Sequence, residues 1–139
     1  MKSRSQAIAD FLEDVLSDGR IENTSKYFHD DVVEEVPLPG QGPGLEGLMD
    51  VLRGLRQAFP DMRWSVEEQI EEGDRVVTRF EWTGTHQAEI FGVPPTGRQV
   101  TVWGVVIDKF DGDKVKSTRI IMDSLGLMSQ LGVFPPPSN

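Results

Sequence analysis

The chain contains no cysteine among its 139 residues. Disulfide bonds, thiolate metal sites and cysteine nucleophiles are therefore excluded. No apolar run approaches the roughly 18 residues that a membrane-spanning helix needs. The N-terminal segment also lacks the apolar block of a signal peptide. From these absences we expect a cytoplasmic protein that makes no membrane contacts.

Basic residues are scarce: 14 Lys and Arg stand against 23 Asp and Glu, for a net charge of -9. Such a protein repels a phosphate backbone, and no basic cluster interrupts the acidic balance, so we expect no nucleic-acid partner. The two histidines, His29 and His86, lie far apart and show no metal-ligand spacing. Nucleotide-binding loops and Gly-x-Ser-x-Gly elbows are also missing. We therefore expect no metal site and no nucleotide cofactor.

The first part of the chain has helical periodicity. Apolar residues recur on one face of residues 5–17, which predicts an amphipathic helix. A short second helix is predicted over 22–28, followed by a short strand over 32–36. Prolines and glycines then fill a loop over 37–44, and a third helix is predicted over 45–59.

Beyond residue 60 the apolar period changes from 3.6 to 2, which is typical of half-buried strands. Four long strands are predicted, at 62–70, 75–85, 99–110 and 114–122. Glu72-Gly73-Asp74 and Asp111-Gly112-Asp113 have the composition of hairpin turns. A closing helical turn is expected over 125–131.

Helices first and a strand meander afterwards indicate an α+β fold. A curved antiparallel sheet must cover one face, and only the three N-terminal helices are available to cover it. The predicted architecture is a cone-shaped sheet wrapped on these helices and enclosing a pocket. We expect a single domain over 1–139, with its core at about 5–132 and a tail at 133–139.

The connection between the second and third long strands is the most distinctive segment. It carries a histidine, a diproline and two glycines, and such loops commonly close or line a site. Together with the two hairpin turns and the C-terminal segment, it resembles the SnoaL-like polyketide cyclase family of the nuclear-transport-factor-2-like superfamily. The matching residues are Glu72 to Val77, Gly84 to His86, Phe91 to Arg98, Asp111-Gly112, Asp123 and Gln130 to Gly132.

This resemblance implies a cone with a mostly apolar pocket, a small apolar or aromatic ligand, and no cofactor. It also implies a homodimer packed through the sheet. Cyclases of the family close a ring by an intramolecular aldol reaction. Two positions that carry acid/base groups in those cyclases, an aspartate and a histidine, match Ile120 and Val105 here. Because neither side chain can transfer a proton, the cyclase route is in doubt.

Four residues are candidates for replacement chemistry. Glu34 matches a family asparagine; it is either a base whose pKa burial would raise or a solvated carboxylate on a short strand. His86 is either a base at the pocket mouth or a residue that fixes the loop. Arg119 and Asp123 could pair near the rim and orient an oxygen, or Asp123 could cap the final helix.

Five residues are predicted to contact a ligand, because they match pocket positions or lie on the distinctive loop. Trp103 could stack on a flat molecule or pack in the core. The full set is Trp103, Val105, Ile120, Met122 and Phe91.

Two functions remain open at this stage. One is a protein that binds a small hydrophobic molecule and transforms it by cofactor-independent acid/base chemistry of the cyclase, isomerase, lyase or hydrolase type. The alternative is a non-catalytic ligand-binding or dimeric interaction module on the same fold, which the apolar side chains of Ile120 and Val105 favour.

Overall fold

A computed structural model of the chain describes residues 2–133. Of the expected tail, residues 134–139 lie outside the described part. The helices are α1 (Arg4–Phe11), α2 (Gly44–Ala58) and α3 (Ser124–Gln130), with a π-helix η1 (Leu12–Ser17) and a 3-10 helix η2 (Ile21–Lys26). Across residues 2–133, every helix is too short or too polar to span a lipid bilayer.

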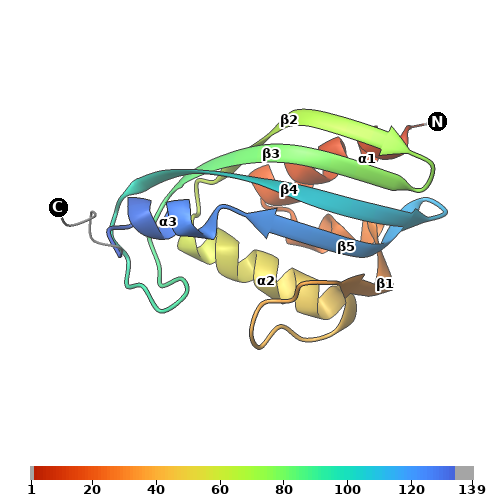
Figure 1. Cartoon of the computed structure of the whole chain (residues 1–139). Coiled ribbons are helices and arrows are strands. Elements are labelled where there is room, and N and C mark those ends of the chain that lie inside the picture. The colour runs from red at the N-terminus through yellow and green to blue at the C-terminus, as the bar shows by residue number, and fades with distance from the viewer. Residues whose placement is uncertain (1, 134–139) are drawn as a thin grey trace.

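Five strands form one curved sheet in the order β1-β5-β4-β3-β2. Their bounds are β1 (Phe28–Glu34), β2 (Arg63–Glu72), β3 (Arg75–Thr85), β4 (Gln99–Asp111) and β5 (Lys114–Met122). Figure 1 shows β2 to β5 side by side as a meander, with β1 along the far side of β5. The predicted α+β cone is therefore confirmed. The sheet is mixed rather than purely antiparallel, because β1 pairs with β5 in parallel.

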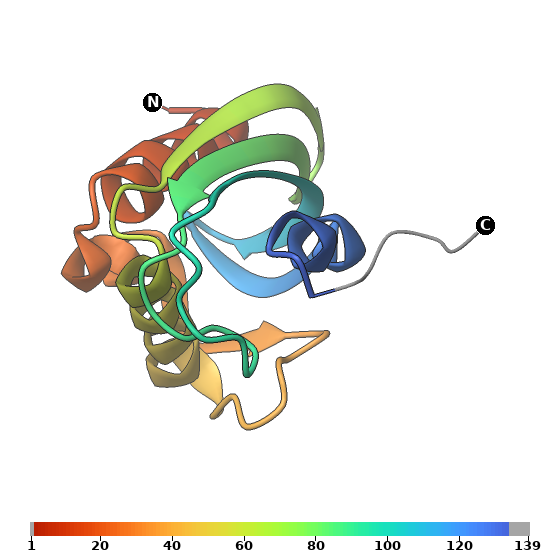
Figure 2. The same ribbon diagram turned by 90° about the vertical axis from the view of Figure 1, so that its left-hand side faces the viewer.

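The helices lie inside the curve of the sheet. Figure 2, which looks along the cone, shows the strands bending around one side while α1 and α2 occupy the other. The buried face of α2, which includes Leu52 and Leu55, joins the core, and the buried residues of α1 and η1 pack beside it. This arrangement places an apolar interior between one layer of helices and the concave side of the sheet.

The first predicted helix is present but changes its winding. Ser3 caps α1 by accepting a hydrogen bond from the Gln6 backbone N–H at 3.0 Å. The helix continues without a break into η1, where the Asp18 N–H reaches the Glu13 carbonyl, five residues back, at 2.9 Å. The wider turn keeps Leu12, Val15 and Leu16 buried against the sheet.

The second predicted helix and the first predicted strand were misplaced. Residues 21–26 form a 3-10 turn, and β1 begins at Phe28 instead of residue 32. Polar side chains favour the tighter turn, since Thr24 Oγ1 donates to the Ile21 carbonyl at 2.6 Å. Phe28 then packs edge-on against Phe11, with ring centroids 4.8 Å apart, which draws the strand start toward the core.

The pairing of β3 with β4 is continuous from Arg75 with Lys109 to Thr85 with Gln99. Paired residues share a face, so even-numbered side chains of both strands turn inward. On β4 the inward set is Val100, Val102, Gly104, Val106, Asp108 and Phe110. Odd-numbered residues turn outward. The two predicted ligand contacts of this strand, Trp103 and Val105, are both odd-numbered and therefore lie on the outer side of the sheet.

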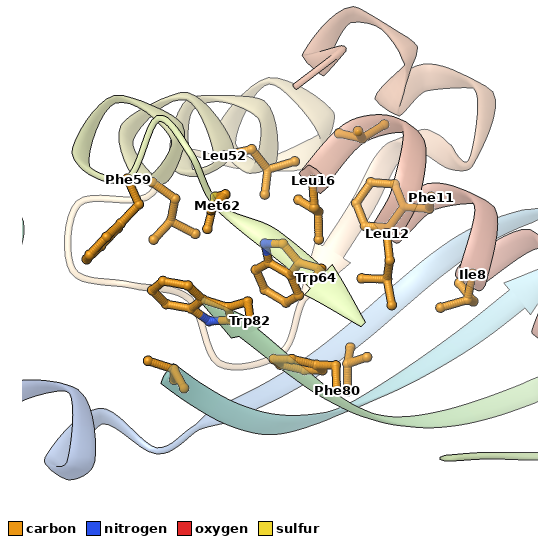
Figure 3. Close-up of a cluster of buried hydrophobic side chains, with 14 of the residues drawn as sticks. Ile8, Phe11, Leu12, Leu16, Leu52, Phe59, Met62, Trp64, Phe80 and Trp82 are labelled. Atoms are coloured by element: carbon orange, nitrogen blue, oxygen red, sulfur yellow. The ribbon is translucent and has the colours of Figure 1, made fainter. Parts of the chain in front are cut away.

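Aromatic rings fill the wide end of the core, as Figure 3 shows. Phe59 from the end of α2 meets Trp82 edge-on, with centroids 4.9 Å apart. Trp64 lies against Phe80 at 4.8 Å and stacks with Trp82 at 5.9 Å. These large rings hold the sheet away from the helices on this side.

Gly104 is the one inward position of β4 that has no room for a side chain. A Cβ there would lie 2.5 Å from the Ile121 carbonyl oxygen and 2.6 Å from the Phe80 ring. We predict that Gly104→Ala destabilises the protein by about 1–3 kcal/mol, because backbone and ring must both move. Chemical denaturation measures this loss.

Gly54 supplies the matched control. It lies within α2, and nothing is within 4 Å of the position of an added Cβ. Gly54→Ala should stabilise the protein by about 0.5–1 kcal/mol through helix propensity. Equal stability of Gly104→Ala and the natural protein would contradict the packing described here.

Candidate functional site

A cavity of about 340 Å³ lies between the concave side of the sheet and the helices. Its walls are mainly apolar. Helical residues contribute one wall, the inward residues of β4 and β5 the opposite one, and the loop after β1 the rim. The lining includes Ile8, Leu12, Leu16, Leu52, Leu55, Trp64, Phe80, Val106 and Ile120. Five polar side chains interrupt this surface: Glu34, Gln41, Asp108, Thr118 and Ser124.

Asp108 is the most unusual residue of the cavity. Its side chain is 2% exposed, and its Oδ1 atom has no hydrogen-bond partner among residues 2–133. Removal from water raises the pKa of the Asp108 carboxyl to about 7; a hydrogen bond from Thr118 opposes this rise, and the nearby Glu34 charge adds to it. The carboxyl can therefore hold or release a proton near neutral pH.

Glu34 lies in the same cross-strand row as Asp108. Thr118 of β5 pairs with Glu34 of β1 on one side and with Asp108 of β4 on the other. Glu34 is half-buried at the rim, and burial raises the pKa of its carboxyl, although hydrogen bonds from the backbone N–H groups of Val36 and Glu35 limit the rise. Its Oε2 accepts the Val36 N–H at 3.2 Å.

The two carboxyl groups thus differ in environment: Asp108 is deep and has one oxygen without a partner among residues 2–133, whereas Glu34 is shallow and partly hydrogen-bonded. Groups with such different surroundings can take opposite roles in proton transfer, one as acid and one as base. Between residues 2 and 133, no group of three His, Cys, Asp or Glu side chains could hold a metal ion.

The family model of SnoaL-like polyketide cyclases matches residues 6–131. The chain belongs to this family. The resemblance found from the sequence motifs is therefore confirmed, and with it the fold class. Among curated proteins, none matches the sequence.

Solved structures support the same assignment. TsrD from Streptomyces laurentii is 25% identical with a TM-score of 0.86, covering 94% of this chain and 95% of that chain. AclR from Streptomyces galilaeus, a proposed hydroxylase, is 25% identical with a TM-score of 0.84 and covers 97% of this chain and 88% of its own. IdmH from Streptomyces antibioticus, a proposed polyketide cyclase, is 30% identical with a TM-score of 0.81 and covers 95% and 100%.

Three of the five predicted ligand contacts of this SnoaL-like protein lie on the cavity: Ile120, Met122 and Phe91. Phe91 has a positive φ of 50°, a conformation that a bulky residue adopts only under constraint. The bridge between Ile90 and Val93 makes this tight turn. The turn thereby brings the half-exposed ring to the cavity rim, so Phe91 remains a predicted ligand contact.

The prediction was wrong for the other two contacts, Trp103 and Val105, because their side chains do not line the cavity. Both belong to the outward set of β4, and the Trp103 side chain is 52% exposed on the convex side of the sheet. The cross-strand partner of Ile120 is Val106, whereas Val105 pairs with Ile121. The pocket position opposite Ile120 is therefore Val106, one residue away from the predicted one.

His86 takes the loop-fixing role that was its alternative reading. It is fully buried, and it does not line the cavity. Its Nδ1 accepts the Thr96 backbone N–H at 3.2 Å and lies 3.1 Å from the Thr96 hydroxyl oxygen. Two backbone bonds, from the His86 N–H to Arg98 and from the Gly97 N–H to His86, close the same loop.

Arg119 and Asp123 do not pair. Arg119 faces outward and lies 3.5 Å from the carboxylate of Glu35, an exposed ion pair. Asp123 caps α3 by accepting the Gly126 N–H at 2.9 Å, which agrees with its helix-capping alternative. Neither residue lines the cavity.

Sequence reasoning missed Asp108. Within 99–110, apolar residues occupy both faces of the strand, so alternation alone did not identify the inward side. A usable signal was present in β3, where Val76, Phe80 and Trp82 set an even-numbered apolar face. Asp108 pairs with Val76, so the register between β3 and β4 puts Asp108 on this same face.

The burial of Asp108 predicts a dependence of stability on pH. Its folded pKa of about 7 lies above the unfolded value, so folding stability falls as pH rises through the window from about 4 to 7. We predict that Asp108→Asn removes this loss, leaving stability nearly unchanged at pH 4 and raising it by about 1–3 kcal/mol at pH 8. Thermal unfolding across this range measures the effect.

Asp61 gives a control of opposite sign. Hydrogen bonds from the Thr85 backbone and hydroxyl lower the pKa of its carboxyl, so its contribution is present above the unfolded pKa and is lost as pH falls. Asp61→Asn should therefore weaken the protein at pH 8. Parallel pH curves for Asp108→Asn and the natural protein would contradict the assigned protonation of Asp108.

Proposed function

We propose that this SnoaL-like protein is a cofactor-independent enzyme that moves a proton on a small, largely apolar molecule. The observation that carries the proposal is Asp108, an almost fully buried carboxyl group in the wall of an apolar cavity, whose Oδ1 has no partner among residues 2–133. Perturbed carboxyl groups in concave apolar sites are typical of acid/base catalysts.

In this proposal Asp108 removes or returns the proton at the reacting carbon. When ionised, its Oδ1 is free to accept the proton, because no protein group occupies it among the described residues. Thr118 holds the carboxyl in place. Glu34 is the second carboxyl. It lies at the rim of the cavity on β1, beside Thr118, and exchanges the proton with water.

The position of Asp108 also offers a substitute for the cyclase aspartate that Ile120 is expected to replace. Val106 lies opposite Ile120, and Asp108 is the next inward residue of β4. The proton-transfer group would thus be supplied from the neighbouring strand, about 7 Å along the sheet.

A non-catalytic binding protein is the second candidate. It is favoured by the apolar residues at the two central positions, Val106 and Ile120, which suit contact with a hydrophobic molecule better than proton transfer. In that case Asp108 and Glu34 would only contribute polar contacts. The two candidates differ in whether the protein accelerates a proton transfer.

The base-promoted ring opening of 5-nitrobenzisoxazole tests the catalytic proposal. A base removes the C–H proton, the N–O bond breaks, and a coloured cyanophenolate is released. We predict that the protein accelerates this reaction, that the rate rises as pH passes through about 7, and that Asp108→Asn lowers it about 100-fold. Glu34→Gln should lower it less, because Glu34 lies at the rim.

Asp113→Asn, in the exposed turn before β5, is the matched control and should leave the rate unchanged. A rate that Asp108→Asn does not alter would reject Asp108 as the base. Binding of the probe without any acceleration would favour the non-catalytic candidate.

We further propose that two copies associate through the convex side of the sheet. Trp103 and Ile121 are exposed on this side, and the half-buried Val105 pairs with Ile121 across β4 and β5. An apolar patch of this kind is typical of an interaction surface, whereas single exposed apolar residues are common on any protein.

Ile121→Glu should convert a dimer to a monomer, because a charge would be buried between copies. Leu125→Glu changes a side chain of equal exposure, 67% against 66%, but on α3, and should leave the dimer intact. Sedimentation of both variants and the natural protein measures this. A natural protein that sediments as a monomer would refute the proposed dimer.

A further inference from the structure

Two buried polar atoms in the cavity wall have no partner within residues 2–133. One is Asp108 Oδ1, and the other is the indole nitrogen Nε1 of Trp64. Asp108 has a proposed catalytic role, whereas the indole N–H has none so far. Buried N–H groups almost always have a hydrogen-bond partner, so an orphan in a ligand-sized cavity needs an explanation.

The Trp64 ring is held firmly in place. Its backbone N–H donates to the buried Ser17 Oγ at 2.8 Å, which ties β2 to the end of η1. One side of the ring packs on Phe80 and Trp82, and the residue is 7% exposed. Rotation of the indole to find another partner would therefore disturb the aromatic cluster.

The indole nitrogen of Trp64 is buried in the wall of the cavity. Figure 3 shows the Trp64 nitrogen on the side of the indole that faces Leu16 and Leu52, and both of these leucines line the cavity. The neighbouring Trp82 differs, because its indole donates to the Met122 sulfur at 3.4 Å. Of these two stacked tryptophans, only Trp64 has an indole N–H without a hydrogen-bond partner among residues 2–133.

A phenylalanine at position 64 would fill much of the same apolar space without leaving an unpaired donor. The retained N–H thus lowers the stability of the empty cavity, and a ligand that accepts the hydrogen bond would recover the loss. This is the physical pattern of a specificity group, since a ligand that lacks the acceptor leaves the donor unpaired.

We propose that Trp64 is the specificity-determining anchor of the site, and that its indole N–H donates to an acceptor oxygen of the ligand, such as a ketone or quinone carbonyl. The inference rests on the proposed function only in taking the cavity as the ligand site. It does not require Asp108 to act as a base.

The sheet register separates this anchor from Asp108. Trp64 pairs with Trp82, which pairs with Val102, and Asp108 lies six positions further along β4. At about 3.3 Å per residue the two rows are at most roughly 20 Å apart, and less where the strand curves. The anchored oxygen and the carbon that faces Asp108 therefore belong to different parts of the ligand.

Two probes of the same shape test the anchor: 2-acetylnaphthalene, which has a carbonyl oxygen, and 2-ethylnaphthalene, which lacks it. Trp64→Phe should lower the ratio of their affinities for the protein about fivefold, since one hydrogen bond is lost. Trp103→Phe, which removes an indole from the convex side, should leave the ratio unchanged. Calorimetric titration gives both affinities.

A second measurement needs no variant. In protein labelled with 15N at its tryptophans, the Trp64 indole N–H resonance should shift downfield on adding 2-acetylnaphthalene and much less on adding 2-ethylnaphthalene. An unchanged affinity ratio in Trp64→Phe, or equal indole shifts with the two probes, would overturn the anchor while leaving the ring-opening result for Asp108 intact. Failure of both probes to bind the natural protein would overturn the anchor and the cavity's role together.

Discussion

The register between β3 and β4 is the constraint on which the rest of the molecule depends. It runs without a bulge from Arg75 to Thr85, so the inward face of both strands is fixed along their whole paired length. A slip by one residue would bring Trp103 and Val105 inside and turn Asp108 out into water. The apolar cavity, its buried carboxyl and the exposed convex patch therefore share one cause, which is the parity of this pairing.

The aromatic cluster reinforces that parity. Phe80 and Trp82 on β3 turn inward, where Trp82 packs against Phe59 and Phe80 packs against Trp64. Gly104 accepts the Phe80 ring at the point where any side chain would collide with it. Residues far apart in the chain thus favour the same register of β3 and β4. The carboxyl group of Asp108 is buried in the core as a consequence.

The long periodic segments and the glycine turns were sufficient to predict the α+β cone, because helical and strand periods are local properties. The site was harder to predict. Glu34 was found because it matches a family position on a short strand, but Asp108 lies in a strand that is apolar on both faces. Its burial depends on pairing with β3, which local alternation does not encode. The direction of β1 was also missed, since parallel pairing with β5 joins distant parts of the chain.

The parallel strand β1 has a consequence for the order in which the site can assemble. Glu34 comes from the first quarter of the chain, while its strand partner Thr118 comes from the last. Contacts between such distant segments form late, because a long loop must close before they can be made. During synthesis the helices and the β2–β3 hairpin can meet first, so the two carboxyl groups come together only when β5 inserts between β1 and β4. Until that step the wall formed by β4 and β5 is incomplete, and a nascent chain has no site in which to hold a ligand.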